Sequence, residues 1–329
     1  MKSMTNAGMA LLALGVMFTA GCERHSNKEV FYLVTVNSAL PYWQTGAAGF
    51  NRAAAQYKVT AKIVGPDNYD PQAEVTALQK AVAAKPGGIL VSVSDATVLQ
   101  PAIDAAVSAG IPVITIDSDA SASRRLYFIG TNNLDAGRLG GKRVVDKLKG
   151  KGNIVVFTIA GQPNIDERLK GLKDAIAAKP DIKIVEEVDI KGDARAAFDK
   201  AQELLAQTGP KRIDGFVCLE SASGKMVSDA LKRANATDRV LVAWDVNQDT
   251  LDGIKGGTID ATIAQKPFTM GYVGLKVLDE IFHAPPKQLG KDYSADSFSP
   301  YPMFVDTGST LVDKDNVDLY IASAAEGNK

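Results

Sequence analysis

Two apolar stretches that each end in aspartate indicate how this chain folds: Pro112-Val113-Ile114-Thr115-Ile116-Asp117 and Val240-Leu241-Val242-Ala243-Trp244-Asp245. Each stretch closes a strand–helix–strand unit of similar length, the first opening at Gly88 and the second at Gly215. This similarity predicts one α/β lobe built twice. Ligands of open parallel sheets bind beyond the carboxyl ends of the strands, so two facing lobes would direct both carboxylates into one cleft.

The rest of the chain alternates short apolar runs with amphipathic segments of helical length. Continuous apolar strands separated by helices are typical of parallel sheets covered on both faces. The predicted fold class is therefore α/β, with two similar doubly wound parallel-sheet lobes joined by a three-segment hinge. The predicted boundaries are 29–131 plus 266–297 for the N-terminal lobe and 132–265 plus 298–322 for the C-terminal lobe. The predicted crossings lie near Thr131–Leu134, Gln265–Phe268 and Ser297–Pro300.

The N-terminus has the pattern of an export signal. Lys2 supplies a positive start, residues 10–20 form a short apolar run, and Thr19-Ala20-Gly21-Cys22 is a small-residue cleavage region. Small residues before a cysteine resemble the lipobox of bacterial lipoproteins, which predicts a signal peptide at 1–22, a lipid anchor at Cys22 and a tether at 23–28. The alternative is a plain export signal with cleavage nearby. Both interpretations place the protein in the periplasm or cell envelope.

Composition and rare residues exclude several classes of function. With 37 basic and 38 acidic residues the chain has no basic excess for nucleic acid. His25 and His283 are its two histidines, too few for a Ser-His-Asp or Cys-His unit or a histidine metal site in the cleft, so we expect no metal and no cofactor. Cys218 lies in a strand-like run and is expected to be structural, without a disulfide. A glycosidase that uses Asp117 and Asp245 stays open as an alternative.

Several motifs occur in a characteristic order: Pro41-Tyr42-Trp43, Gly110–Asp117, Ile129–Asn133, Glu167–Gly171, Asp245 and Asp260–Gln265. Through them the chain, from about Val30 to Tyr320, resembles periplasmic sugar-binding proteins of the ribose/galactose type. These are receptor subunits of bacterial ABC sugar importers and share their fold with the sensor domains of Lac-repressor-like regulators. A repressor would need a DNA-binding helix-turn-helix where the export signal stands.

The resemblance implies the type I periplasmic binding protein fold and a binding protein that is not an enzyme. Its ligand would be a monosaccharide or related polyol, captured in the interlobe cleft by hinge closure and delivered to the membrane subunits of an ABC permease. Presentation of the ligand to a chemoreceptor or sensor kinase is the alternative. The protein is expected to be a monomer that meets the membrane only through its lipid anchor.

The family's ligand residues carry over to matching positions. Tyr42 and Trp43 would sandwich the sugar ring between aromatic faces, or else pack in the core at a helix start. Asp117 and Asp245 would accept sugar hydroxyls, or else cap the helices that follow them. Arg168 would donate to hydroxyls, or else lie on a solvated helix start.

Further candidates come from the hinge and from departures from the family pattern. Gln265 offers a donor and an acceptor at the interlobe crossing, or else stabilises the hinge. Asn37 ends the first strand, and Asp119 stands in the region where ribose binders have arginine. Either Glu220 or Ser223 would replace the asparagine that family members carry in the second lobe. The resulting acidic set favours a neutral polyol or a cationic ligand over an anionic sugar acid.

Overall fold

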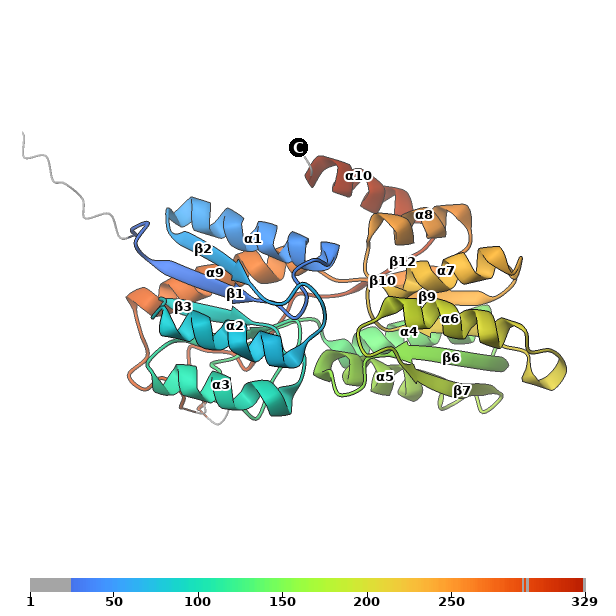
Figure 1. Cartoon of the computed structure of the whole chain (residues 1–329), viewed down its shortest axis with the longest axis horizontal. Helices are drawn as coiled ribbons and strands as arrows, with labels where there is room; N and C mark the ends of the chain where they lie inside the picture. Colours follow the sequence, from blue (N-terminus) through green and yellow to red (C-terminus); the bar gives the residue numbers. More distant parts are fainter. Residues whose placement is uncertain (1–24, 292, 294–295, 328–329) are drawn as a thin grey trace, which may run out of the picture.

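In this computed structural model, which describes residues 25–291, 293 and 296–327, the chain forms two α/β lobes side by side (Figure 1). This arrangement confirms the predicted fold class. The predicted signal peptide, including Cys22, lies outside the described residues. Among the helices of the described part, none combines the length and the apolar composition that a membrane span needs.

The N-terminal lobe is built on a parallel sheet. Its strands are β1 (Val30–Val34), β2 (Thr60–Val64), β3 (Gly88–Val91), β4 (Val113–Ile116), β5 (Phe128–Gly130) and β11 (Phe304–Asp306). They lie in the order β11-β5-β4-β3-β1-β2, and every pairing is parallel. One face carries α1 (Pro41–Tyr57) and α9 (Pro267–His283), and the other carries α2 (Pro71–Ala83) and α3 (Ala96–Ser108).

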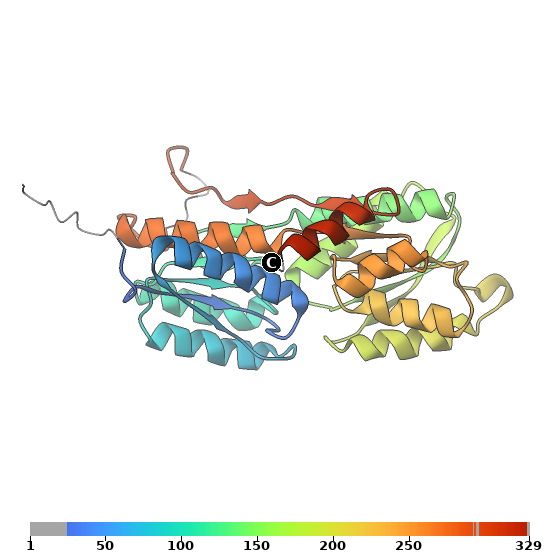
Figure 2. The same ribbon diagram turned by 90° about the horizontal axis from the view of Figure 1, so that it is seen from above.

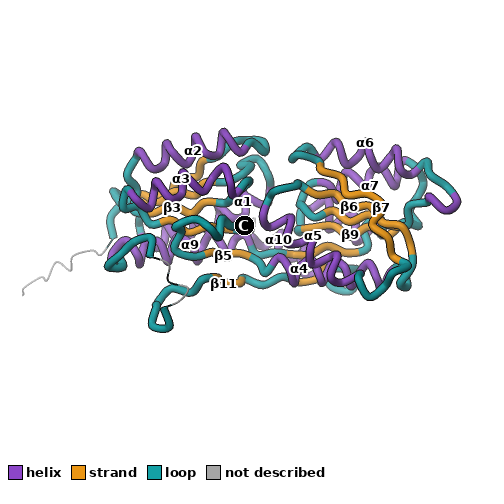
Figure 3. The backbone as a smooth tube through the Cα atoms, turned by 90° about the horizontal axis from the view of Figure 1, so that it is seen from below, coloured by secondary structure: helices purple, strands orange, loops and turns teal. Residues whose placement is uncertain are grey.

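The C-terminal lobe repeats this plan. Its strands are β6 (Gly152–Thr158), β7 (Ile182–Asp189), β8 (Gly215–Cys218), β9 (Val240–Trp244), β10 (Ala261–Ala264) and β12 (Thr310–Val312). They lie in the order β12-β10-β9-β8-β6-β7, with only β12 antiparallel to its neighbour. Its helices are α4 (Asn133–Lys147), α5 (Pro163–Ile176), α6 (Ala194–Leu205), α7 (Ser223–Arg233), α8 (Gln248–Gly256) and α10 (Val317–Gly327), with a short 3-10 turn at Gly209–Lys211. Figure 3 shows helices on both faces of each sheet.

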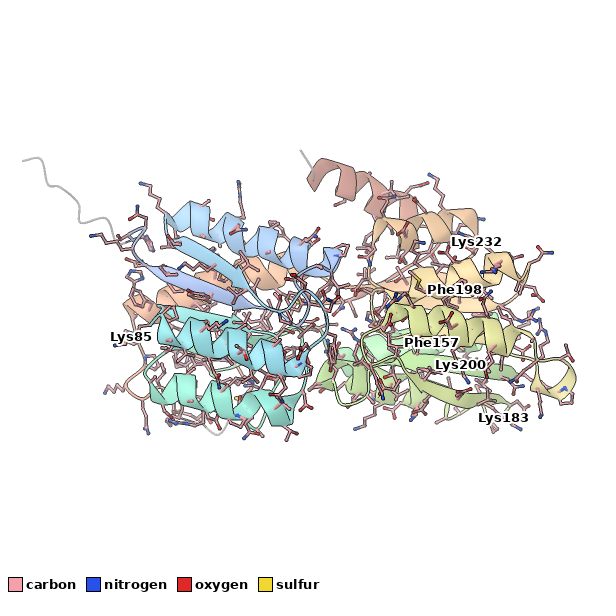
Figure 4. The ribbon with its side chains drawn as sticks, in the orientation of Figure 1. Lys85, Phe157, Lys183, Phe198, Lys200 and Lys232 are labelled. Carbon is pink, nitrogen blue, oxygen red and sulfur yellow. The ribbon has the colours of Figure 1, made fainter. Side chains whose placement is uncertain are left out.

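Apolar strands hold each lobe together. The middle strands are buried along their whole length, as expected for a sheet covered on both faces. In the C-terminal lobe Phe157 of β6 and Phe198 of α6 lie between sheet and helix (Figure 4), and Phe157 stacks on Phe216 with ring centres 6.2 Å apart. Cys218 is fully buried in the same core, and burial raises the pKa of its thiol well above the ordinary value.

Two glycines bring α4 and α5 into close contact. A Cβ on Gly137 would lie 2.1 Å from the carbonyl oxygen of Arg168, and one on Gly171 would lie 2.0 Å from that of Leu134. Both distances are far below van der Waals contact, so any larger residue would push the helices apart. This packing places the first turns of α5, and with them Arg168, against the hinge side of the lobe.

The chain passes between the lobes three times, at 131–132, 265–266 and 307–309. The third crossing is later than predicted, and the expected position at Ser297–Pro300 is wrong. Residues 304–306 form β11, which hydrogen-bonds β5 in the N-terminal sheet before the chain enters β12. In Figure 2 this last segment runs along the molecule from one lobe to the other.

Residues 25–28 of the predicted tether lie against the N-terminal lobe. His25 stacks on Tyr57 with ring centres 4.9 Å apart, and Thr60 donates a hydrogen bond of 2.7 Å to the carbonyl of Asn27. This described part of the segment therefore belongs to the folded body and does not act as a free tether.

Candidate ligand-binding site

A cleft lies between the lobes at the carboxyl ends of their strands. The cavity between its lining residues has a volume of about 70 Å³. Eight of the nine ligand residues predicted from the sequence line it: Asn37, Tyr42, Trp43, Asp117, Arg168, Glu220, Asp245 and Gln265. Residues from both lobes and from a hinge crossing thus meet around one space.

The two aspartates occupy equivalent places in the two lobes. Asp117 follows β4 with φ 66°, and Asp245 follows β9 with φ 63°. Their backbone N–H groups donate equivalent hydrogen bonds, of 3.0 Å to Ile129 and 2.9 Å to Ile263, each in the next strand. A left-handed conformation is uncommon for residues with a side chain and tends to occur at functional sites.

Neither aspartate caps a helix, which was the alternative interpretation. The chain after Asp117 leads to β5 without an intervening helix, and α8 is preceded by Asn247, two residues beyond Asp245. Both side chains are buried, 4% and 6% exposed, and both line the cleft.

Asp117 joins the two lobes through its carboxylate. Its Oδ1 accepts a 2.6 Å hydrogen bond from the hydroxyl of Tyr42, and its Oδ2 accepts one of 3.0 Å from Asn164 on α5. Arg168 lies 3.9 Å away. Burial raises the pKa of Asp117 above its ordinary value, with Arg168 and Tyr42 acting in the opposite direction.

Arg168 lies at the centre of the polar network. Its three nitrogens donate hydrogen bonds to Asn133 Oδ1 at 2.8 Å, to the carbonyl of Leu219 at 2.9 Å and to Gln265 Oε1 at 2.9 Å. Its guanidinium lies 5.2 Å from the ring centre of Trp244, a cation–π contact. Only 2% of Arg168 is exposed, so the alternative of a solvated helix residue is wrong.

Gln265 connects the hinge to the second aspartate. Its Oε1 also accepts a 2.8 Å hydrogen bond from Thr131 in the first crossing, and its Nε2 donates one of 2.9 Å to Asp245 Oδ1. Gln265 therefore lines the cleft and also ties two hinge crossings together, so the two roles considered for it are compatible.

The cleft is acidic around a single arginine. Burial raises the pKa of Asp245 to about 7, while Arg168 and the hydrogen bond from Gln265 lower it and Asp117 and Glu220 raise it further. A desolvated carboxylate short of donors is stabilised by any ligand that supplies hydroxyl groups. An anionic ligand would instead add repulsion.

The two aromatic residues both line the cleft, at the start of α1. Tyr42 and Trp43 meet edge to face with ring centres 5.3 Å apart, and both also contact the core of the N-terminal lobe. The core and ligand interpretations of these residues are thus both compatible with their positions. The hydroxyl of Tyr42 is already bonded to Asp117, so it orients that carboxylate.

Asp119 does not line the cleft, which corrects the expectation for it. Arg125 binds it through two nitrogens, Nη2 donating at 2.6 Å to Oδ2, and Thr115 donates to Oδ1 at 2.6 Å. The arginine six residues later in the same loop neutralises this carboxylate. The acidic set at the cleft therefore consists of Asp117, Glu220 and Asp245.

Glu220 lines the cleft, but its carboxylate binds the start of α7. It accepts hydrogen bonds of 2.7 Å from the backbone N–H groups of Ala222 and Ser223. The first N–H groups of a helix have no partner within the helix and attract an acceptor. Glu220 has the helix-end role that was considered for the aspartates.

The sequence interpretation missed four polar residues of the cleft: Ser221, next to Glu220, and three others, Tyr69, Gln162 and Asn164. Gln162 and Asn164 precede and begin α5, in the loop beyond β6. Tyr69 lies in the loop beyond β2. All three follow the carboxyl ends of strands, which is where the general rule for parallel sheets predicts ligand contacts. Oε1 of Gln162 and Oδ1 of Asn164 are buried acceptors without a hydrogen-bond partner among the described residues.

The lobes touch across the mouth of the cleft. A Cβ on Gly192, which has φ 79°, would lie 2.4 Å from Cβ of Tyr69 in the opposite lobe. Together with the Asn164–Asp117 hydrogen bond, this contact shows a closed arrangement of the lobes. Glycine at 192 allows both the left-handed turn and the close approach.

Comparison with known proteins agrees with this architecture. The family model of the periplasmic binding protein domain matches residues 31–284. The xylitol-binding protein of Mycolicibacterium smegmatis is 27% identical over 316 residues, which cover 95% of this chain and 84% of that protein. AraP, an arabinose binding protein from Geobacillus stearothermophilus, is 34% identical with a TM-score of 0.73, over 89% of this chain and 99% of AraP.

A third similar protein has been solved with a sugar. An ABC transporter solute binding protein from Burkholderia graminis, in complex with D-arabinose, is 27% identical with a TM-score of 0.79, over 88% of this chain and 96% of that one. The family match spans most of both lobes, and these similarities confirm the resemblance seen in the sequence motifs. This chain belongs to the periplasmic binding protein family.

Proposed function

We propose that this protein is an extracytoplasmic solute-binding protein that captures a monosaccharide or related polyol between its lobes and delivers it to the permease of an ABC importer. The observation that carries the proposal is the pair Asp117 and Asp245, which line one cleft and follow equivalent strands of the two lobes. The relatives named for xylitol and arabinose support a polyhydroxylated ligand.

The free acceptors of the cleft match the chemistry of a polyol. Among residues 25–291, 293 and 296–327, Gln162 and Asn164 each have a buried oxygen without a donor, and the carboxylate of Asp245 receives one hydrogen bond, from Gln265. A buried acceptor without a partner costs about 1–3 kcal/mol. A ligand with several hydroxyl groups would supply the missing donors, and Trp43 would cover an apolar face of its ring.

Hinge closure would couple binding to transport. The three crossings let the lobes move as rigid bodies about a few residues. A bound ligand favours the closed form because only that form brings the acceptors of both lobes to it. The permease would then recognise the spacing of the outer lobe faces. Presentation to a chemoreceptor or sensor kinase would use the same closed form.

The first prediction concerns ligand class. Thermal unfolding of the protein with pentoses, hexoses, deoxysugars, inositols and sugar acids should identify a neutral ligand that stabilises it. At 100 times its dissociation constant such a ligand adds about 2.7 kcal/mol to the free energy of unfolding. Stabilisation by sugar acids alone, or by no member of the panel, would contradict the proposal.

The two tryptophans provide an independent readout of the same binding. Trp43 lines the cleft and Trp244 lies beneath Arg168, so ligand binding should change the fluorescence. In Trp43→Phe the affinity should fall and the remaining signal should come from Trp244 alone. An unchanged affinity would remove Trp43 from the site.

We also propose that Cys22 is lipidated and anchors the exported protein, on the pattern Thr19-Ala20-Gly21-Cys22. Cells supplied with a fatty acid that carries an alkyne tag should incorporate the tag into this protein, and Cys22→Ser should abolish incorporation. Cys218→Ser is the matched control, because Cys218 is fully buried and should leave labelling unchanged. Persistent labelling of Cys22→Ser would show that the anchor lies elsewhere or that the label is nonspecific.

A further inference from the structure

The outer end of the N-terminal lobe, away from the cleft, gathers both histidines of the chain. His25 precedes β1, and His283 ends α9, which begins at the hinge and runs to this end of the lobe (Figure 1). Their rings meet edge to face with centres 5.0 Å apart. Asp279, one turn earlier on α9, lies beside both rings, and one ligand atom from each of the three residues lies within 4.8 Å of the others.

The distances within this cluster are close to those of a metal site. Nε2 of His25 lies 2.9 Å from Oδ2 of Asp279, and Nδ1 of His283 lies 3.6 Å from Oδ1 of the same carboxylate. In a tetrahedral zinc site with bonds of about 2.0–2.1 Å, neighbouring ligand atoms lie about 3.4 Å apart. Small side-chain movements would therefore suffice to place one ion among these atoms.

The cluster also contains more acceptors than donors. Within the part of the chain that the structure describes, Oδ1 of Asp279 is buried without a hydrogen-bond partner, and the residue is only 3% exposed. Oε2 of Glu29, 3.4 Å from Nε2 of His283, is also buried and accepts no hydrogen bond from any described residue. A buried carboxylate oxygen without a donor is costly. A cation at this point would remove the cost for both carboxylates.

His283 also faces more hydrogen-bond acceptors than a neutral imidazole has N–H groups. Its Nδ1 lies 2.9 Å from the backbone carbonyl oxygen of Asp279, and its Nε2 faces Glu29. A neutral imidazole carries one N–H group, so one of its nitrogens presents a lone pair to an oxygen acceptor. Either an additional proton or a metal ion would resolve this contact.

We propose that His25, Asp279 and His283 form a binding site for a divalent transition-metal ion of the zinc type, with Glu29 as the neighbouring carboxylate. Two imidazoles and a carboxylate suit Zn²⁺ and disfavour Ca²⁺ and Mg²⁺, which prefer oxygen ligands. The ion joins the segment before β1 to the end of α9, and so fixes the start of the folded chain on the N-terminal lobe. The expectation of no metal considered histidines in the cleft, whereas these meet at the opposite end of the lobe.

Calorimetric titration of the full chain with ZnCl₂, in detergent and after removal of metals, tests the proposal. One Zn²⁺ should bind per chain and raise the unfolding temperature. Loss of a group that only orients a metal ligand lowers metal affinity roughly 10–100-fold. His25→Ala and His283→Ala remove the ligands themselves, so each should lower the affinity for Zn²⁺ by at least that factor. Glu280→Gln is the matched control, since Glu280 neighbours Asp279 on α9 but is exposed.

A second measurement distinguishes direct coordination of the metal ion by the histidines from electrostatic attraction without coordination. Co²⁺ in place of Zn²⁺ should give the visible absorption of a site with nitrogen ligands, and His283→Ala should remove that absorption. The proposal is overturned if the chain binds no Zn²⁺, or if binding survives both histidine substitutions.

Discussion

Replacing Asp245 with asparagine should weaken binding of the ligand identified by the sugar panel roughly 10–100-fold. The substitution keeps the shape and the hydrogen bond with Gln265 but removes the charge that the sugar hydroxyls would meet. Hydrogen bonds to charged groups contribute about 1.5–3 kcal/mol, which corresponds to this loss of affinity. Titration calorimetry on both proteins measures the difference.

The pH dependence provides a sharper test of the same residue. The pKa of Asp245 in the ligand-free protein is about 7, and ligand hydroxyls would lower it by stabilising the carboxylate. Wild-type affinity should therefore fall as the pH decreases below about 7, by at most about tenfold per pH unit. In Asp245→Asn this contribution should be absent. A variant with the wild-type pH profile would exclude Asp245 as the titrating group.

The same substitution should stabilise the ligand-free protein. A carboxyl group whose folded pKa is raised from 3.8 to about 7 favours folding most at low pH, and this contribution is lost as the pH rises between those values. Above pH 7 the variant avoids the cost of a buried charge, so its free energy of unfolding should exceed that of wild type by up to a few kcal/mol. Asp119→Asn is the control, because Asp119 pairs with Arg125 outside the cleft and should leave ligand affinity unchanged.

The lobes and the aspartate pair were predictable because the signals that specify them are local. Each aspartate ends an apolar strand, and the carboxyl-end rule then fixes where its side chain lies. β11 is a three-residue strand with partly exposed side chains, and its short apolar run, Met303-Phe304-Val305, does not indicate which sheet it joins. The third crossing was consequently assigned too early.

The sequence does not predict contacts between residues far apart in the chain, nor which of several competing partners a side chain binds. Glu220 is an acidic residue at the cleft, but its carboxylate accepts a hydrogen bond from a backbone N–H group at the helix start two residues later. Asp119 is neutralised by Arg125 across a loop turn. The approach of His25 to Asp279, 254 positions apart, depends on the direction of α9 across the lobe, which no local pattern specifies.

Replacing Arg168 with alanine should cause the largest loss of stability among the cleft residues. Its guanidinium bonds three acceptors from different segments of the C-terminal lobe and its hinge, and it is the charge that offsets Asp117 and Asp245. Removing one partner of a buried charged network costs about 3–5 kcal/mol, because the remaining groups stay buried without compensation. Urea unfolding of the ligand-free protein measures this loss, and sugar binding should disappear with it.

Arg138→Ala is the matched control for this prediction. Arg138 also binds two carboxylates, Asp135 at 2.9 Å and Asp174 at 2.8 Å, but its side chain is 41% exposed. Exposed ion pairs contribute about 0–1 kcal/mol, so this variant should unfold almost like wild type and bind sugar normally. Arg168→Lys should fall between the two, because an ammonium group keeps the charge but lacks the planar arrangement of donors that reaches all three acceptors. Equal losses of unfolding free energy for Arg168→Ala and Arg138→Ala would mean that the buried arginine contributes no more than a surface ion pair. The polar network around Arg168 would then not be what stabilises the hinge side of the cleft.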